Sequence, residues 1–195
     1  MRKKHIPRRD ELYDLLHKTP VIPAVKSSEG LRECLGGDSG IVFVLFGDIL
    51  TIPGIVAKIK EAGKLVLVHA DLIDGLTSRD VAADFLEEHT GADGILSIKP
   101  NLIKHAKSRG LLTIQRFFVL DSMSLFNIEK QFPLEYADAI EILPGLMPKI
   151  IRKISDISKK PVIAGGLISE REDVRLALEA GAVSVSTTNS SLIRN

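Results

Sequence analysis

The chain has 195 residues, of which 45% are hydrophobic, so it is long enough to bury one sizeable core and a single domain is expected over residues 1–195. Its 26 Lys and Arg against 25 Asp and Glu give a net charge of +1, which excludes the overall basic charge of a dedicated nucleic-acid-binding protein and leaves only a local patch for contact with a polyanion. The single Cys34 excludes an intramolecular disulfide, and the absence of a signal peptide or long apolar stretch predicts a cytoplasmic protein with no membrane partner.

The chain opens with a basic lead and a short amphipathic helix (residues 10–17), which together occupy residues 1–19. Apolar, β-rich runs then alternate with helical patterns to the end of the sequence. Clear helical patterns cover residues 78–89, 148–158 and 170–180, the last followed by Gly181 as a stop signal. The candidate strands are eight: residues 21–26, 41–47, 65–71, 94–98, 112–119, 139–143, 161–165 and 183–187.

Strands joined by helical crossovers are parallel, and continuous apolar runs such as residues 41–46 indicate strands that are covered on both sides. Eight units that recur roughly every 23 residues favour a closed, minimal (β/α)8 TIM barrel. The alternative is an open doubly wound sheet, which would have about five or six strands and a Gly-rich first turn. The first turn, residues 26–30, lacks that signature.

The last helix is expected to be truncated, because only eight residues follow Thr187. The groove that it would cover must then be filled by the N-terminal helix or by another subunit. A homodimer is therefore a plausible partner arrangement.

Charged residues fall at or near the late ends of the first six predicted strands, whereas earlier strand positions are nearly all apolar. A barrel brings the carboxyl ends of its strands to one rim, which is where this fold carries its functional groups. The residues concerned are Lys26, Asp48, His69, Asp71, Lys99, Arg116 and Glu141.

Glu141 lies inside an otherwise apolar strand, and burying a carboxylate without a partner is costly. We therefore expect it to face the polar mouth near Lys99 or Arg116. The plainer alternative is an ion pair that only closes the top of the barrel. The candidate residues for the polar end of a ligand are His69, Asp71, Arg116, Glu141 and Lys99.

The ends of the seventh and eighth strands carry glycines and hydroxyls in place of charges. Glycines let the backbone approach an anion, hydroxyls donate hydrogen bonds, and loops after these two strands often bind phosphate in this fold. The candidate phosphate ligands are Gly165, Gly166, Thr187, Thr188 and Asn189. No cofactor is expected, and zinc-type clusters are lacking, although Glu141 and Asp71 would suit a hard metal.

Five segments at strand ends, in the same order along the chain, together resemble the glycerol uptake operon antiterminator regulatory family. The resemblance implies a bacterial regulator, not an enzyme, that binds glycerol 3-phosphate and then leader mRNA of glycerol-utilisation operons. The fourth strand end, residues 97–100, follows the family pattern more loosely. The segments are Val68-His-Ala-Asp-Leu-Ile-Asp-Gly75, Ile114-Gln-Arg-Phe-Phe-Val-Leu-Asp-Ser122, Glu141-Ile-Leu-Pro-Gly-Leu-Met-Pro148, Ala164-Gly-Gly166 and Ser186-Thr-Thr-Asn189.

The competing hypothesis is a barrel enzyme acting on a small phosphorylated polyol or sugar, as an aldolase, an isomerase or a glycerophosphodiesterase. Glu141 would then act as acid or base with Lys99 or His69 as partner. For the regulator, the RNA patch would come from the lead at residues 2–9 or from the basic helix at residues 104–109.

Overall fold

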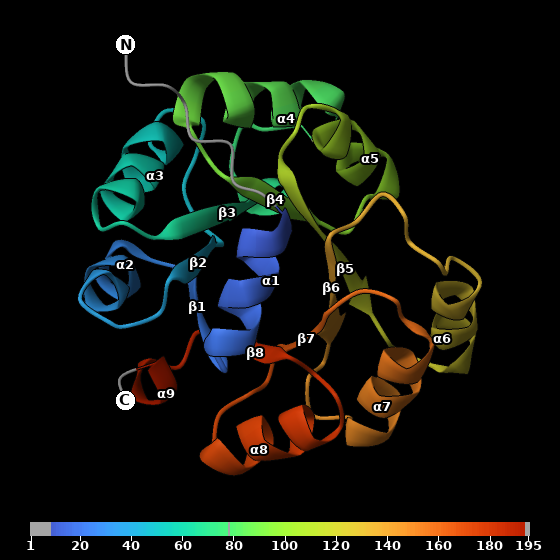
Figure 1. The fold of residues 1–195 in the computed structure, drawn as a ribbon. Coiled ribbons are helices and arrows are strands. Elements are labelled where there is room, and N and C mark those ends of the chain that lie inside the picture. The colour runs from blue at the N-terminus through green and yellow to red at the C-terminus, as the bar shows by residue number, and fades with distance from the viewer. Residues whose placement is uncertain (1–8, 78, 194–195) are drawn as a thin grey trace.

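The computed structural model describes residues 9–77 and 79–193, whose strands close into one barrel, seen along its axis in Figure 1. Neighbouring strands are parallel and follow one another in chain order, and β8 pairs back to β1. Each predicted apolar run contains a strand, so the (β/α)8 barrel is confirmed. The strands are β1 (Val21–Val25), β2 (Ile41–Val44), β3 (Leu65–His69), β4 (Gly94–Ser97), β5 (Leu112–Phe118), β6 (Ala139–Leu143), β7 (Val162–Gly165) and β8 (Ser184–Thr187).

Helices cover the outside of the barrel between successive strands. A proline stands at the first or second position of α3, α5 and α7, where its missing N–H has no intrahelical partner to lose. The helices are α2 (Ser28–Leu35), α3 (Ile52–Glu61), η1 (Ala70–Leu72), α4 (Asp80–Phe85), η2 (Leu86–Thr90), α5 (Pro100–Ser108), α6 (Ser122–Glu129), α7 (Pro148–Ile157), α8 (Arg171–Glu179) and α9 (Ser190–Ile193). Among the described helices, none has both the length and the apolar character needed to cross a membrane.

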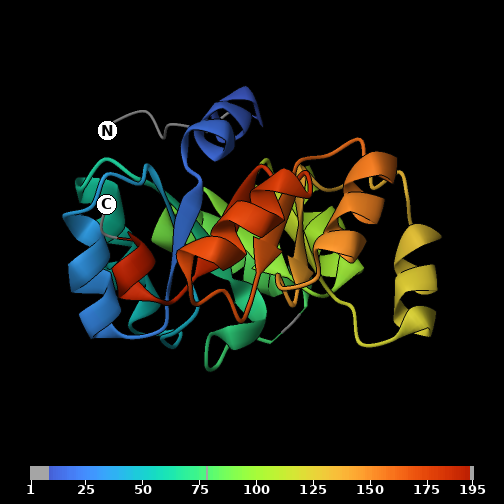
Figure 2. The ribbon, with the colours of Figure 1, turned by 90° about the horizontal axis from the view of Figure 1, so that it is seen from below.

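The N-terminal helix α1 (Arg9–Lys18) lies across the end of the barrel from which the strands start (Figure 2). Its buried Leu12 and Leu16 pack with the residues that fill the barrel interior. The Ser184 hydroxyl donates a 2.7 Å hydrogen bond to the Leu16 carbonyl. The helix therefore closes the barrel floor. The sequence analysis had offered α1 or another subunit to fill the groove of the truncated last helix, and α1 does not fill it. The short α9 packs there, against β1 and α2, and dimerisation stays a prediction.

Side chains alternate between the barrel interior and the layer under the helices. The interior holds one apolar cluster that includes Ile22, Ala24 and Ile114, and the larger cluster lies between barrel and helices. Following the same alternation, the positions two residues beyond Ala24 and Ile114 are Lys26 and Arg116. The interior face is thus apolar in its lower layers and becomes polar where the strands end.

Two aspartates tie pairs of strands together at the floor. Asp93, just before β4, accepts a hydrogen bond from the Val66 backbone N–H at 2.9 Å and pairs with Lys60 at 2.5 Å. Asp138, just before β6, accepts from the backbone N–H and the hydroxyl of Thr113 at 3.0 and 3.1 Å, and its other oxygen pairs with Lys107. Each of these buried carboxylates is thereby matched by a backbone donor and a cation.

Candidate functional site

The centre of the barrel mouth is an ion pair between neighbouring strands. Glu141 in β6 lies opposite Arg116 in β5 in the strand register, and Arg116 Nε is 2.5 Å from Glu141 Oε2. The other oxygen, Oε1, accepts a 2.5 Å hydrogen bond from the Ser186 hydroxyl in β8. Glu141 is 0% exposed, so both partners offset the cost of burying its charge. The sequence prediction of a charged partner is confirmed for Arg116.

Gly165 leaves the space that this contact needs. A Cβ added at Gly165 would stand 2.5 Å from Glu141 Oε1 and 2.6 Å from the Ser186 hydroxyl oxygen. Any larger residue would therefore push the carboxylate and the hydroxyl apart. Gly165 therefore allows the contact between Glu141 and Ser186 to form, a role that the sequence did not reveal.

His69, at the end of β3, lies beside the ion pair. Its burial, together with the positive charge of Arg116, lowers the pKa of the imidazole to about 4, which keeps the ring neutral at pH 7. Its Nδ1 is 3.6 Å from Asp71 Oδ2, too far for a hydrogen bond. Asp71 Oδ2 instead accepts from the Ile98 backbone N–H at 3.0 Å.

Two buried polar atoms in this corner, His69 Nδ1 and Asp71 Oδ1, have no hydrogen-bond partner in the described part of the chain. Unsatisfied buried polar atoms are rare in native proteins and mark functional sites or bound solvent. The predicted neighbourhood of His69, Asp71 and Arg116 is therefore present, with unused hydrogen-bonding capacity.

The loops after β7 and β8 are joined by side-chain hydrogen bonds. The Thr187 hydroxyl donates to the Ile168 carbonyl at 2.8 Å and accepts from the Asn189 N–H at 3.1 Å. The Asn189 amide donates to the Ser169 carbonyl at 2.8 Å, and its oxygen accepts from the Ser191 N–H at 3.0 Å. These two side chains hold the two loops together, and their expected contact with phosphate stays a prediction.

The backbone of the β7 loop is held in an unusual conformation. Gly166 and Leu167 have φ angles of +75° and +63°, a region that glycine adopts freely and leucine rarely does. Such strain persists only where the surrounding structure imposes it, and it often accompanies binding sites. The loop therefore presents its backbone, with no side chain at Gly166, toward the mouth.

One cavity of about 540 Å³ extends from the β7 and β8 loops to Arg116, the member of the predicted polyol end that lines it. Arg116 and Ser186 line it on the side of the ion pair, and the β7 and β8 loops line it on the other. This volume is in the range of small-molecule sites. The predicted residues that line it are Arg116, Gly166, Thr187, Thr188 and Asn189.

Ser186 lines this cavity but was not among the predicted ligand residues, and five predicted residues do not line it: His69, Asp71, Lys99, Glu141 and Gly165. Lys99 is exposed at the start of α5, where its backbone N–H donates to the Ser97 hydroxyl. The expected partner Glu141 bonds to Arg116 and Ser186 through its two oxygens. Ser186 was not singled out, although its spacing of two from Ser184 places it on the interior face. Asp48 is half-buried and accepts hydrogen bonds from the backbone of the β2 loop.

A ring of exposed apolar side chains surrounds the polar mouth. Six successive βα loops each contribute one, with Leu50 87% exposed and Leu120 82% exposed. Low-dielectric walls around a charged floor focus its electrostatic field on a bound ligand. The other members of the ring are Leu72, Ile98, Leu146 and Leu167.

The fold and the cavity together define a (β/α)8-barrel protein with a polar, ligand-sized site at the carboxyl ends of its strands. Residues 21–193 match the family model described as glycerol-3-phosphate responsive antiterminator, and the chain belongs to this family. The resemblance inferred from the strand-end segments is thereby confirmed.

Individual relatives agree. A protein from Escherichia coli K12 named uncharacterized protein YgcP is 44% identical over 178 residues, covering 91% of this chain and 93% of that protein. The glycerol uptake operon antiterminator regulatory protein of Listeria monocytogenes has a solved structure with 36% identity and a TM-score of 0.83, over 87% of this chain and 91% of that one. A related protein from Thermotoga maritima shows 34% identity and a TM-score of 0.78, over 89% and 97%. Aldolases and an epimerase match at 17% identity or less and share the fold alone.

Proposed function

We propose that the mouth cavity binds glycerol 3-phosphate, and that binding changes the affinity of this chain for leader RNA without chemical turnover of the ligand. The observation that carries the proposal is the single cavity that joins the β7 and β8 loops to Arg116 and Ser186. The end at the β7 and β8 loops offers backbone and hydroxyl donors to an anion. The end at Arg116 and Ser186 offers charged and hydroxyl groups that can bind the hydroxyls of a ligand.

The polar end of the cavity, at Arg116 and Ser186, suits a polyol because its hydrogen-bond donors are held in place before any ligand arrives. Glu141 fixes Arg116 through Nε, which leaves the other guanidinium N–H groups available toward the cavity. Glu141 itself is buried beneath them with both oxygens engaged. This arrangement supports a positioning role for Glu141 and makes it a poor general acid or base, which favours a sensor over an enzyme.

Calorimetry with glycerol 3-phosphate, glycerol and inorganic phosphate tests the ligand. We expect glycerol 3-phosphate to bind more tightly than either fragment, because only it reaches both ends of the cavity. Phosphorus and proton NMR of the recovered ligand should then show it unchanged. Consumption of the ligand would replace the sensor by the enzyme alternative, and equal affinity for glycerol would place the phosphate outside the cavity.

The RNA surface is proposed at the opposite end of the barrel. Arg9, which ends the predicted basic lead, has its Nε 3.9 Å from the same Asp138 oxygen that pairs with Lys107 of the predicted basic helix. Burial and the nearby charge of Arg9 lower the pKa of Lys160, with a further contribution from Lys107. Lys104 lies 5.0 Å over the ring of Tyr136. Arg9 and the predicted basic helix are thus neighbours, and with Lys160 they form a local basic patch. Residues 2–8 of the predicted lead lie outside the described residues.

Salt dependence identifies the residues that touch RNA. With a transcript of the leader that precedes the glycerol-uptake genes of the same genome, the double variant Lys104→Gln, Lys160→Gln should bind more weakly and with a shallower salt dependence. Lys58→Gln, which alters an exposed lysine in the last turn of α3, is the matched control. Because the coupling is reciprocal, RNA must raise glycerol 3-phosphate affinity by the same factor that the ligand raises RNA affinity. A double variant that behaves like the control would move the RNA surface elsewhere.

A further inference from the structure

The proposed phosphate end of the cavity lacks a free positive charge of its own. Residues 165–169 and 187–191, which form the β7 and β8 loops, contain no charged side chain, and Arg116 is paired with Glu141. A phosphate monoester carries about −1.5 to −2 charges at pH 7. Moving such a group out of water without an opposite charge is costly. A cation beside these loops would add the opposite charge that their backbone and hydroxyl donors do not supply.

Lys26 is placed to supply it. It directly follows β1, whose Ile22 and Pro23 lie next to Ser186 and Thr187 of β8 in the strand register. Its spacing of two from Ala24 gives it the parity of the barrel interior. The Leu45 N–H donates to the Val25 carbonyl at 2.8 Å, and the Ser27 hydroxyl caps α2, so the backbone on both sides of Lys26 is fixed.

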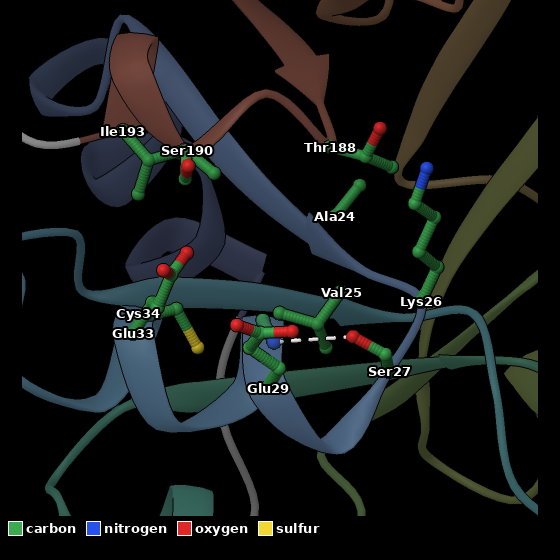
Figure 3. A pocket seen from close by; sticks show the side chains of 11 residues that line it. Ala24, Val25, Lys26, Ser27, Glu29, Glu33, Cys34, Thr188, Ser190 and Ile193 are labelled. Carbon is green, nitrogen blue, oxygen red and sulfur yellow. Dashed lines mark hydrogen bonds between the residues drawn. The ribbon is translucent and has the colours of Figure 1, made fainter.

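Lys26 lines a cavity that adjoins the cavity of the mouth. Lys26 and Thr188 line a second cavity of about 250 Å³, and Thr188 and Ala24 line both this cavity and the larger one. Figure 3 shows the Lys26 ammonium and the Thr188 hydroxyl on the same side of the view, with Glu29 and Glu33 on the far side of the cavity, along α2. Thr188 is thus the shared boundary between Lys26 and the proposed phosphate position.

Lys26 is also available for a ligand. It is exposed, and within residues 9–77 and 79–193 no carboxylate forms an ion pair with it. By contrast, the lysines at the barrel floor that flank buried carboxylates, Lys60 and Lys107, are each paired. An unpaired lysine next to an uncharged anion site has an unused interaction to make.

We propose that Lys26 is the phosphate-binding cation of this site: its ammonium pairs with the phosphate of a ligand held at Gly166 and Thr188. The inference rests on the proposed function, because it assigns a partner to the same ligand. Lys26 then makes the site selective for phosphorylated over neutral polyols, and the uncharged loops provide geometry.

The test is calorimetry with glycerol 3-phosphate, inorganic phosphate and glycerol on four proteins: wild type, Lys26→Gln, Lys26→Arg and Lys149→Gln. Lys149 is the matched control, an exposed lysine near the start of α7. Lys26→Gln should weaken both phosphate-containing ligands by about tenfold to a hundredfold, the loss expected for a charged hydrogen bond. Lys26→Arg should recover most of that loss, and glycerol binding and the control should not change.

A pH series separates charge from structure. Glycerol 3-phosphate gains its second negative charge near pH 6, so wild-type affinity should rise from pH 5 to pH 7. That rise should shrink in Lys26→Gln, which a purely structural role of Lys26 would not cause. Equal affinity of wild type and a folded Lys26→Gln would overturn the proposal.

The same data distinguish the two levels of inference. A wild-type chain that binds inorganic phosphate but not glycerol 3-phosphate would overturn the proposed function, while the Lys26 comparison still decides this inference. A wild-type chain that binds neither would overturn both.

Discussion

The β5–β6 strand pair has two buried carboxylates, Asp138 just before β6 and Glu141 inside it, and they differ in what surrounds them. At the floor, Asp138 is 1% exposed and meets Thr113 and Lys107. At the mouth, Glu141 is 0% exposed and meets Arg116 and Ser186, but it lies under a cavity and near unsatisfied atoms of His69 and Asp71. A buried charge pair alone therefore does not mark a functional site. The open space and the unused hydrogen-bonding groups around it do.

The largest expected effect is a loss of stability when the contacts of Asp138 at the barrel floor are removed. Asp138→Ala removes both hydrogen bonds to Thr113 and leaves its backbone N–H buried without an acceptor, so the free energy of unfolding should fall by about 3 kcal/mol. Urea denaturation measures this loss. Asp138→Asn, which keeps one acceptor, should lose less. Glycerol 3-phosphate affinity of the folded protein should stay within about twofold, and a large change there would contradict the division between floor and mouth.

At the mouth, the effect should fall on affinity. Glu141→Gln removes the charge that holds Arg116 and should weaken glycerol 3-phosphate by about 1 to 3 kcal/mol. Its stability loss should be smaller than that of Asp138→Ala. Because Arg116 and Ser186, not Glu141, line the cavity, Ser186→Ala should show part of the same loss in calorimetry. Unchanged affinity in both variants would make the ion pair a structural closure like the floor.

Gly166 sharpens the comparison by affecting both properties. Gly166→Val should block the proposed phosphate position and also strain the fold, because Gly166 has a φ of +75° and an added Cβ would lie 3.1 Å from Leu143 Cδ2. We expect a stability loss of about 1 to 2 kcal/mol along with weak ligand binding. Thermal unfolding and calorimetry on the same sample measure the two effects, and full affinity would remove Gly166 from the site.

The smallest effect is a pH dependence that belongs to the mouth. His69 has a folded pKa of about 4, below the unfolded value of about 6.5, so the unfolded chain binds more protons between these pH values. Above about pH 6.5 the ring is neutral in both states, and its protonation does not affect the free energy of unfolding. This free energy decreases as the pH falls toward 4, by about 1 kcal/mol at pH 5.5. His69→Gln should flatten this part of the stability curve in urea titrations. An identical curve for the variant would assign the acid sensitivity to other groups.

The sequence was sufficient for the strands because residues such as 41–44 and 65–68 form short, continuous apolar runs, rich in β-branched residues, that are typical of strands covered on both sides. The predictions extended several strands too far, for example to Gly47 and Asp71, because the polar ends of the runs belong to the mouth loops. Glycine and aspartate there serve turns, and composition alone does not say where pairing stops.

Pairings across the barrel were beyond the sequence. That Glu141 meets Arg116 and not Lys99 depends on the register between β5 and β6, and on Lys99 lying beyond the end of β4. The position of α1 under the floor, marked by Leu12 and Leu16, likewise depends on the shape of the closed barrel. The site was predicted as a set of strand ends, and its hydrogen bonds follow from three-dimensional packing.

Asp138 also bears on how β6 pairs during folding. Side chains of a strand alternate between two faces, so a slip of β6 by one residue would turn Ile140 and Ile142 into the mouth and Glu141 into the apolar layer under the helices. The strand has only five residues, Ala139–Leu143, and so few ladder hydrogen bonds to oppose such a slip. Asp138 accepts two hydrogen bonds from Thr113 of β5, which it can do only in the native register. A shifted strand would leave the Asp138 carboxylate buried without these donors. Asp138 thus favours the native register of β6 against β5. The pairing of Glu141 with Arg116 at the mouth follows from that register.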